Sequence, residues 1–62
     1  MTVARWEFWS VAMMLIATHG DEAEYEAADK LEDAQARKHS GDILVWNEIL
    51  IKIAEIRAEK AK

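Results

Sequence analysis

The sequence contains no cysteine, no proline and only two glycines. Without cysteine, the chain can form neither a disulfide bridge nor a thiolate-bound zinc or iron–sulfur site. Its 62 residues provide one domain at most, and a domain of this size buries only about 60% of the surface that its unfolded chain exposes. These limits exclude a Rossmann domain, a barrel, and any enzyme that needs a deep pocket between layers.

A long apolar run is also missing. The most apolar stretch, residues 8–17, has about half of the roughly 20 residues that a membrane-spanning helix needs. Glu7 precedes it, where a signal peptide would carry positive charge. We therefore expect a cytoplasmic protein that makes no use of a membrane.

Basic side chains are outnumbered, because eight lysines and arginines stand against twelve acidic residues, which gives a net charge of −4. Residues 21–33 hold seven acidic side chains and a single base, Lys30. No basic stripe is present that could bind phosphates and release their counterions. The sequence thus predicts no direct contact with nucleic acid and no attraction to an anionic membrane.

The residues that are abundant favour helices, because alanine, glutamate, lysine, isoleucine and leucine dominate. Two glycines mark breaks, Gly20 and Gly41, and each is expected to adopt the left-handed conformation that ends a helix. Asp21 is expected to begin the second helix in a capping box with Glu24, and Asp42 or Ser40 the third. We predict an all-α, three-helix miniprotein with helices at about 3–19, 21–38 and 42–60.

Helical spacing predicts which sides of these helices face the core. On the third helix, one stripe is apolar (Trp46, Ile49, Ile53, Ile56) and a narrow strip is polar (Glu48, Lys52, Glu55, Glu59). The inward side of the second helix carries mostly small residues (Ala23, Ala27, Leu31, Ala34). This helix therefore offers little apolar area to cover its two neighbours.

The first and third helices each present a second apolar face. We expect an oligomer or partner interface at Trp6, Trp9 and Met13 of the first helix and at Leu44 and Ile51 of the third. Soluble monomers rarely expose a contiguous apolar patch, which favours a homo-oligomer or a protein partner. The alternative is that one copy buries an unusually complete core.

Acidic side chains follow one side of the second helix, because Glu22, Glu26, Asp29 and Asp33 are spaced i, i+4, i+7 and i+11. Such a face is a candidate docking surface for a basic partner, and the alternative is a solvated face that provides solubility. Carboxylates on one exposed helix do not enclose a cation, so we expect no metal and no cofactor. We also expect no catalysis: His19 and His39 fit the negative ends of helix dipoles, and the neighbouring hydroxyl residues, Thr18 and Ser40, lack any recognisable catalytic setting.

Several fixed positions together resemble a family of small, uncharacterised proteobacterial proteins, some of them encoded near mobile elements. The pattern joins Trp9 to the segment His-Gly-Asp-x-Ala at 19–23, and then joins Gly41-Asp42 to Trp46 and Ile49. In those proteins a glycine often stands between Gly-Asp and Trp, where this chain has residues 43–45 (Ile-Leu-Val). The resemblance implies a short helical fold and no known activity.

Two functional hypotheses follow. The first is a non-enzymatic protein–protein interaction module that uses the apolar faces of the first and third helices. The alternative is an inhibitor of phage or plasmid type, similar in principle to an anti-CRISPR or DNA-mimic protein. It would dock the acidic second helix on a basic nucleic-acid-binding protein.

Overall fold

The computed structural model describes the backbone of residues 5–60 and the side chains of residues 7–59. Helix α1 spans Arg5–His19, a short 3-10 turn (η1) spans Gly20–Glu22, α2 spans Ala23–Ala36 and α3 spans Ser40–Lys60. The all-α prediction is confirmed. The expected start of the first helix at residue 3 lies outside the described residues.

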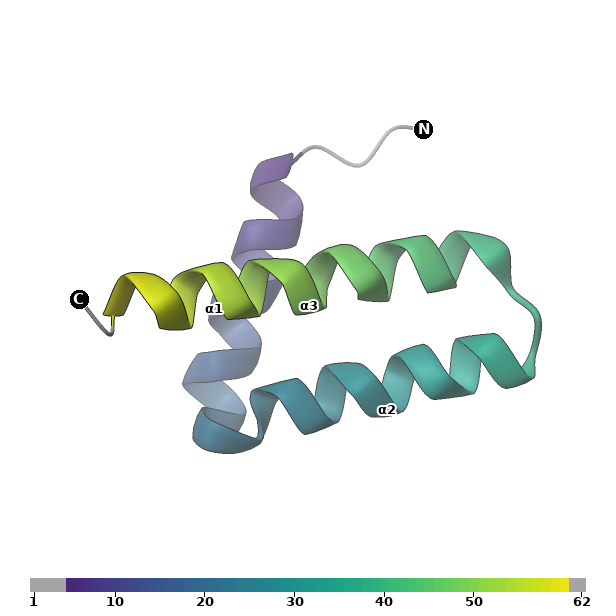
Figure 1. Ribbon diagram of the computed structural model, residues 1–62, viewed down its shortest axis with the longest axis horizontal. Coiled ribbons are helices and arrows are strands. Elements are labelled where there is room, and N and C mark those ends of the chain that lie inside the picture. The colour runs from purple at the N-terminus through teal and green to yellow at the C-terminus, as the bar shows by residue number, and fades with distance from the viewer. Residues whose placement is uncertain (1–4, 61–62) are drawn as a thin grey trace.

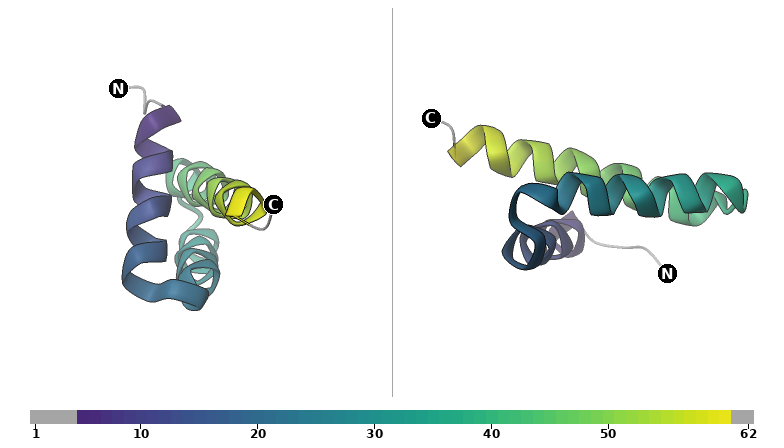
Figure 2. Two further views of the ribbon diagram at one scale, coloured as in Figure 1. Left: turned by 90° about the vertical axis from the view of Figure 1, so that its left-hand side faces the viewer. Right: turned by 90° about the horizontal axis from the view of Figure 1, so that it is seen from below.

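The helices are arranged in two layers. Helices α2 and α3 run antiparallel, side by side, and α1 crosses one face of this pair transversely (Figure 1). Views from the side and from below place α1 in a layer of its own (Figure 2). Among the described residues, no helix covers the other face of the α2–α3 pair. This arrangement leaves α1 with one side on the core and its opposite side free.

The first junction follows the expected glycine but not the expected cap. Gly20 has φ +58°, the left-handed conformation that glycine adopts without steric cost. The capping box is wrong, because the turn η1 intervenes and α2 begins after Glu22 without a side-chain cap. The carboxylate of Glu24 is instead bound by Arg57 of α3.

The second junction differs from the prediction, because Lys38 and not Gly41 is left-handed, with φ +57°. The N–H groups of Lys38 and His39 donate to the carbonyls of Gln35 and Ala34, 3.1 and 3.0 Å away, which is the Schellman pattern for ending a helix. The Nδ1 atom of His39 then accepts the N–H of Asp42 at 3.2 Å. His39 therefore caps α3, and the expected caps at Ser40 and Asp42 are wrong.

Small side chains make up much of the core. The buried apolar residues are Ala12, Ala23, Ala27, Ala34, Ile49, Ile53 and Ile56. Partly buried apolar side chains, Trp46 among them, pack around this core. The alanines let the helix backbones approach closely, but they contribute little apolar area.

The predicted polar strip of the third helix is wrong at Lys52, because this residue is only 6% exposed. It lies three residues after Ile49 and four before Ile56, which places it on the same side of α3 as both. Its ammonium group lies 3.3 Å from Oε2 of Glu55, whose side chain is half exposed. The aliphatic stem of Lys52 thus joins the apolar layer while its charge is balanced at the edge.

Candidate functional site

Large apolar side chains remain on the surface of both helices that were expected to carry them. Among the expected interface residues, Trp9, Met13, Leu44 and Ile51 are 38, 46, 69 and 48% exposed, respectively. The side chain of Trp6, the fifth residue of that set, lies outside the described ones. Met14 and Tyr25 are also well exposed, at 65 and 76%, and were not among the expected residues.

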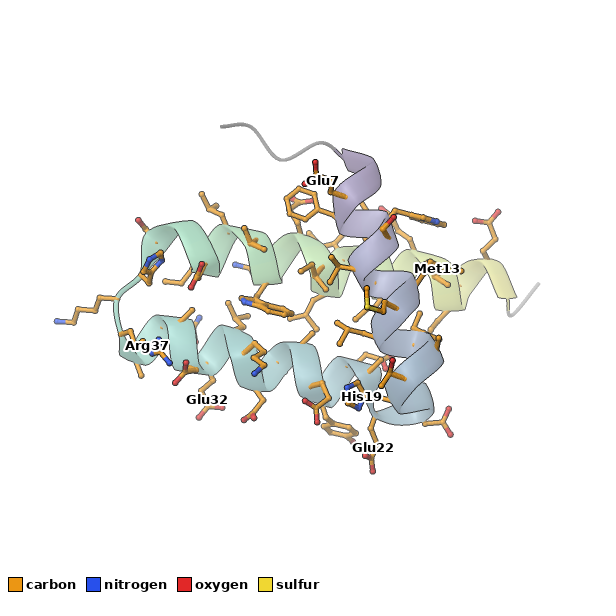
Figure 3. The ribbon with its side chains drawn as sticks, turned by 180° about the vertical axis from the view of Figure 1, so that it is seen from behind. Glu7, Met13, His19, Glu22, Glu32 and Arg37 are labelled. Carbon is orange, nitrogen blue, oxygen red and sulfur yellow. The ribbon has the colours of Figure 1, made fainter. Side chains whose placement is uncertain are left out.

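The free side of α1 is a surface without charge. We call this the outer α1 face, and it consists of Trp9, Ser10, Met13, Met14 and Ala17, all exposed. No charged side chain occurs between Glu7 and His19. Figure 3 shows Met13 on the near side of α1, with the α2–α3 pair behind the helix. A solvent-facing helix side normally carries charged residues, so this face has the composition of an interface.

The exposed apolar residues of α3 form a separate surface. Leu44 and Ile51, the outer α3 edge, are seven residues apart and so share one side of the helix. At 100° per residue, Leu44 lies opposite the fully buried Ile53. This edge therefore points away from the core, and the structure keeps it apart from the outer α1 face.

The predicted acidic face is exposed over most of its length. Glu22, Asp29 and Asp33 are exposed and Glu26 is half-buried. Asp33 is paired with Arg37 one turn later, at 2.8 Å, and Glu22 lies in η1, before α2 begins. In Figure 3, Glu22 and Glu32 lie along the edge of α2 that faces away from α3. A shallow hollow on this edge is lined by Tyr25, Glu26, Ala28, Asp29 and Glu32.

An ion pair between distant parts of the chain was missed by the sequence reasoning. Arg57 of α3 binds the carboxylate of Glu24 through Nε and Nη2, and Nη2 also donates to the carbonyl of Gly20 at 2.6 Å. The hydrogen bond from Arg57 holds the pKa of Glu24 below its usual value, and the same bond raises the pKa of Arg57. No local signal could have found this pair, because 33 residues separate its members.

The described residues offer no centre for metal chemistry. Within them, no group of three or more histidine or acidic side chains is placed to hold a metal ion. Every buried side-chain nitrogen or oxygen there has a hydrogen-bond partner. Over the same part of the chain, no helix combines the length and apolar character that crossing a membrane requires.

Comparison with protein-family models, with curated proteins and with solved structures found no match to this chain. The resemblance to small proteobacterial proteins thus stays a prediction. The functional argument has to be made from the surface of the molecule itself.

Proposed function

We propose that this chain is a non-enzymatic protein–protein interaction module, a cytoplasmic three-helix protein that works as a homo-oligomer. Its binding surfaces are the outer α1 face and the outer α3 edge. The observation that carries the proposal is the exposure of Trp9, Met13, Leu44 and Ile51 on a chain whose fully buried large side chains are Ile49 and Ile53. Removing large apolar side chains from water is favourable, so their exposure on the surface favours binding of a partner that covers them.

The proposal is tested by affinity capture with the tagged full chain, using extract of the cell that encodes it. The matched control is a double variant, Met13→Glu and Leu44→Glu, which changes exposed positions only and is checked for helicity by circular dichroism. A protein bound by the wild type and lost by the variant, whether a second copy or another chain, is the expected result. Equal capture by both, together with a monomeric wild type, contradicts the proposal.

The acidic face supports a second candidate function, inhibition of a basic nucleic-acid-binding protein. The observation in its favour is the shallow hollow at Tyr25, whose lining includes the acidic residues Glu26, Asp29 and Glu32. The test reverses Glu22, Glu26, Asp29 and Asp33 to lysine in the presence of the captured protein. Loss of binding, with salt weakening the wild-type complex, is expected for docking through this face. Binding that survives unchanged rules the candidate out.

A further inference from the structure

The outer α1 face differs from the rest of the described surface in having no charge over three helical turns. Trp9, Ser10, Met13, Met14 and Ala17 are all exposed on this face, and the nearest acidic or basic residues before and after them, histidine aside, are Glu7 and Asp21. Resting on the proposed function, we infer that the occupant of this face is a second copy of the chain. Its α1 packs against the first α1 about a two-fold axis.

Charge points to a second copy. The chain carries a net charge of −4, and residues 21–33 hold seven of its twelve acids. Two copies that met through α2 would place these acids against each other at a cost in free energy. Two copies that meet through the outer α1 face bring no charge together. A partner of opposite charge would be drawn to α2 instead, whereas homodimer interfaces are apolar and depleted of charge.

The sizes of the side chains on the outer α1 face are suited to packing against a second α1 helix. At 100° per residue, Ser10 and Ala17 follow its middle line, Trp9 and Met13 lie along one border and Met14 along the other. Small side chains in the middle let two helix axes approach to about 8–10 Å. The larger side chains at the borders can then pack beside the partner helix, where methionine adapts to irregular gaps.

The size of the face sets the strength of the contact. Helix α1 has 15 residues and is therefore about 22 Å long, with a width of about 10–12 Å including side chains. Contact between two such helices buries less than the roughly 800 Å² per partner of a standard interface. We therefore expect a reversible dimer that dissociates on dilution.

The first test is sedimentation of the full chain from micromolar to millimolar concentration, compared with two single variants. Met13→Glu lies on the outer α1 face, and the control Ala54→Glu changes an exposed residue of α3 that belongs to neither binding surface. The expected result is a monomer–dimer equilibrium for the wild type and the control, and a monomer of unchanged helicity for Met13→Glu. Added salt should strengthen the dimer, because it screens the repulsion between two chains of charge −4.

The second test uses the absence of cysteine. Met13 lies midway along the length of the outer α1 face, so a two-fold axis through this level of the face brings it close to the Met13 of the second copy. The variant Met13→Cys should form a disulfide-linked dimer under mild oxidation, whereas Ala54→Cys, at an exposed position outside both binding surfaces, should not. This comparison keeps the inference testable even if the glutamate variant loses helicity.

The outcomes separate this inference from the proposed function. A wild type that stays monomeric at millimolar concentration overturns the inference, as does a dimer that persists in Met13→Glu. The monomeric result also removes the homo-oligomer from the proposed function. In either case a module that binds another protein stands if capture of that protein is lost in the double variant. If the chain neither self-associates nor captures a protein, both proposals fail.

Discussion

Arg57 and Glu24 join the far end of α3 to the start of α2 through a two-pronged ion pair. The guanidinium also holds the carbonyl of Gly20, so one side chain ties α3 to the turn between α1 and α2. Planar, bidentate pairs of this kind are the strongest class of surface ion pair. The link therefore holds the C-terminal part of α3 against the junction between α1 and α2.

The first prediction concerns this link. Arg57→Ala should lower the midpoint of thermal unfolding, because it removes hydrogen bonds to both Glu24 and Gly20. Arg37→Ala is the matched control, because Arg37 pairs with Asp33 only one helical turn away and both side chains are exposed. Pairs of this kind contribute about 0.3–0.5 kcal/mol to stability. Circular dichroism melts of the two variants should show the larger decrease for Arg57→Ala. Equal decreases would show that the long-range pair adds no more than an ordinary helix-surface pair.

The second prediction concerns pH. The hydrogen bond from Arg57 lowers the pKa of Glu24 in the folded chain. The ionised Glu24 therefore stabilises the fold fully at any pH above the pKa of this carboxyl in the unfolded chain, about 4.5. That contribution is lost as the pH falls through the lowered folded pKa. Urea unfolding of the wild type and of Glu24→Gln should therefore differ most near neutral pH and converge in acid. A difference that stays constant from neutral pH to acid would contradict the assignment.

The third prediction concerns the core. Ile53→Asp should leave the chain unfolded, because Ile53 is fully buried and an unpaired charge there cannot be compensated in so small a domain. Ile51→Asp, two residues away on the exposed outer α3 edge, is the control and should keep the helical spectrum. Far-ultraviolet circular dichroism distinguishes the two. A cooperative melt of Ile53→Asp near that of the wild type would show that the core has been assigned to the wrong side of α3.

The fourth prediction concerns the two glycines, which should respond to alanine with opposite signs. Gly20→Ala should destabilise the chain by about 1–2 kcal/mol, because the left-handed conformation at φ +58° is unfavourable for a residue with a Cβ atom. Gly41→Ala should stabilise it by about 0.4–1 kcal/mol, since an added Cβ meets only the His39 ring at 3.7 Å. Denaturant titrations of both variants check the signs. A loss of stability in Gly41→Ala would mean that this position needs glycine after all.

Local patterns predicted much of the fold. Composition and apolar spacing predicted the all-α class, and the left-handed Gly20 was placed correctly. Alanines expected on the inward side of α2, among them Ala23 and Ala27, are buried. In each case the signal lies within a few residues of the feature that it predicts.

The wrong predictions concern positions where the structure depends on a residue far away in sequence, or on a residue type that is unusual for its role. The capping box failed because Glu24 is bound by Arg57, a partner 33 residues away. The prediction for the junction between α2 and α3 was wrong because Lys38, not Gly41, is left-handed and His39 caps α3. Lys52 was expected in a polar strip by residue type, although its spacing from Ile49 and Ile56 places it on their side of α3.

The sequence predicted which residues belong to the candidate site, but not that they form two separate surfaces. The sequence showed that Trp9, Met13, Leu44 and Ile51 exceed what a small core can bury, and they are exposed. It could not show that α1 lies across the α2–α3 pair, which is what separates the outer α1 face from the outer α3 edge. That separation depends on how the helices pack, and no local pattern encodes it.

The transverse position of α1 also sets the order in which parts of the molecule open. Ala12 is the only described residue of α1 that is fully buried, and the larger apolar side chains with which α1 contacts the core, Phe8, Val11, Leu15 and Ile16, stay partly exposed to solvent. Helices α2 and α3 are neighbours in sequence and pack along their lengths (Figure 1). We expect the amide protons of α1 to exchange with solvent before those of α2 and α3, through local opening of one helix rather than global unfolding.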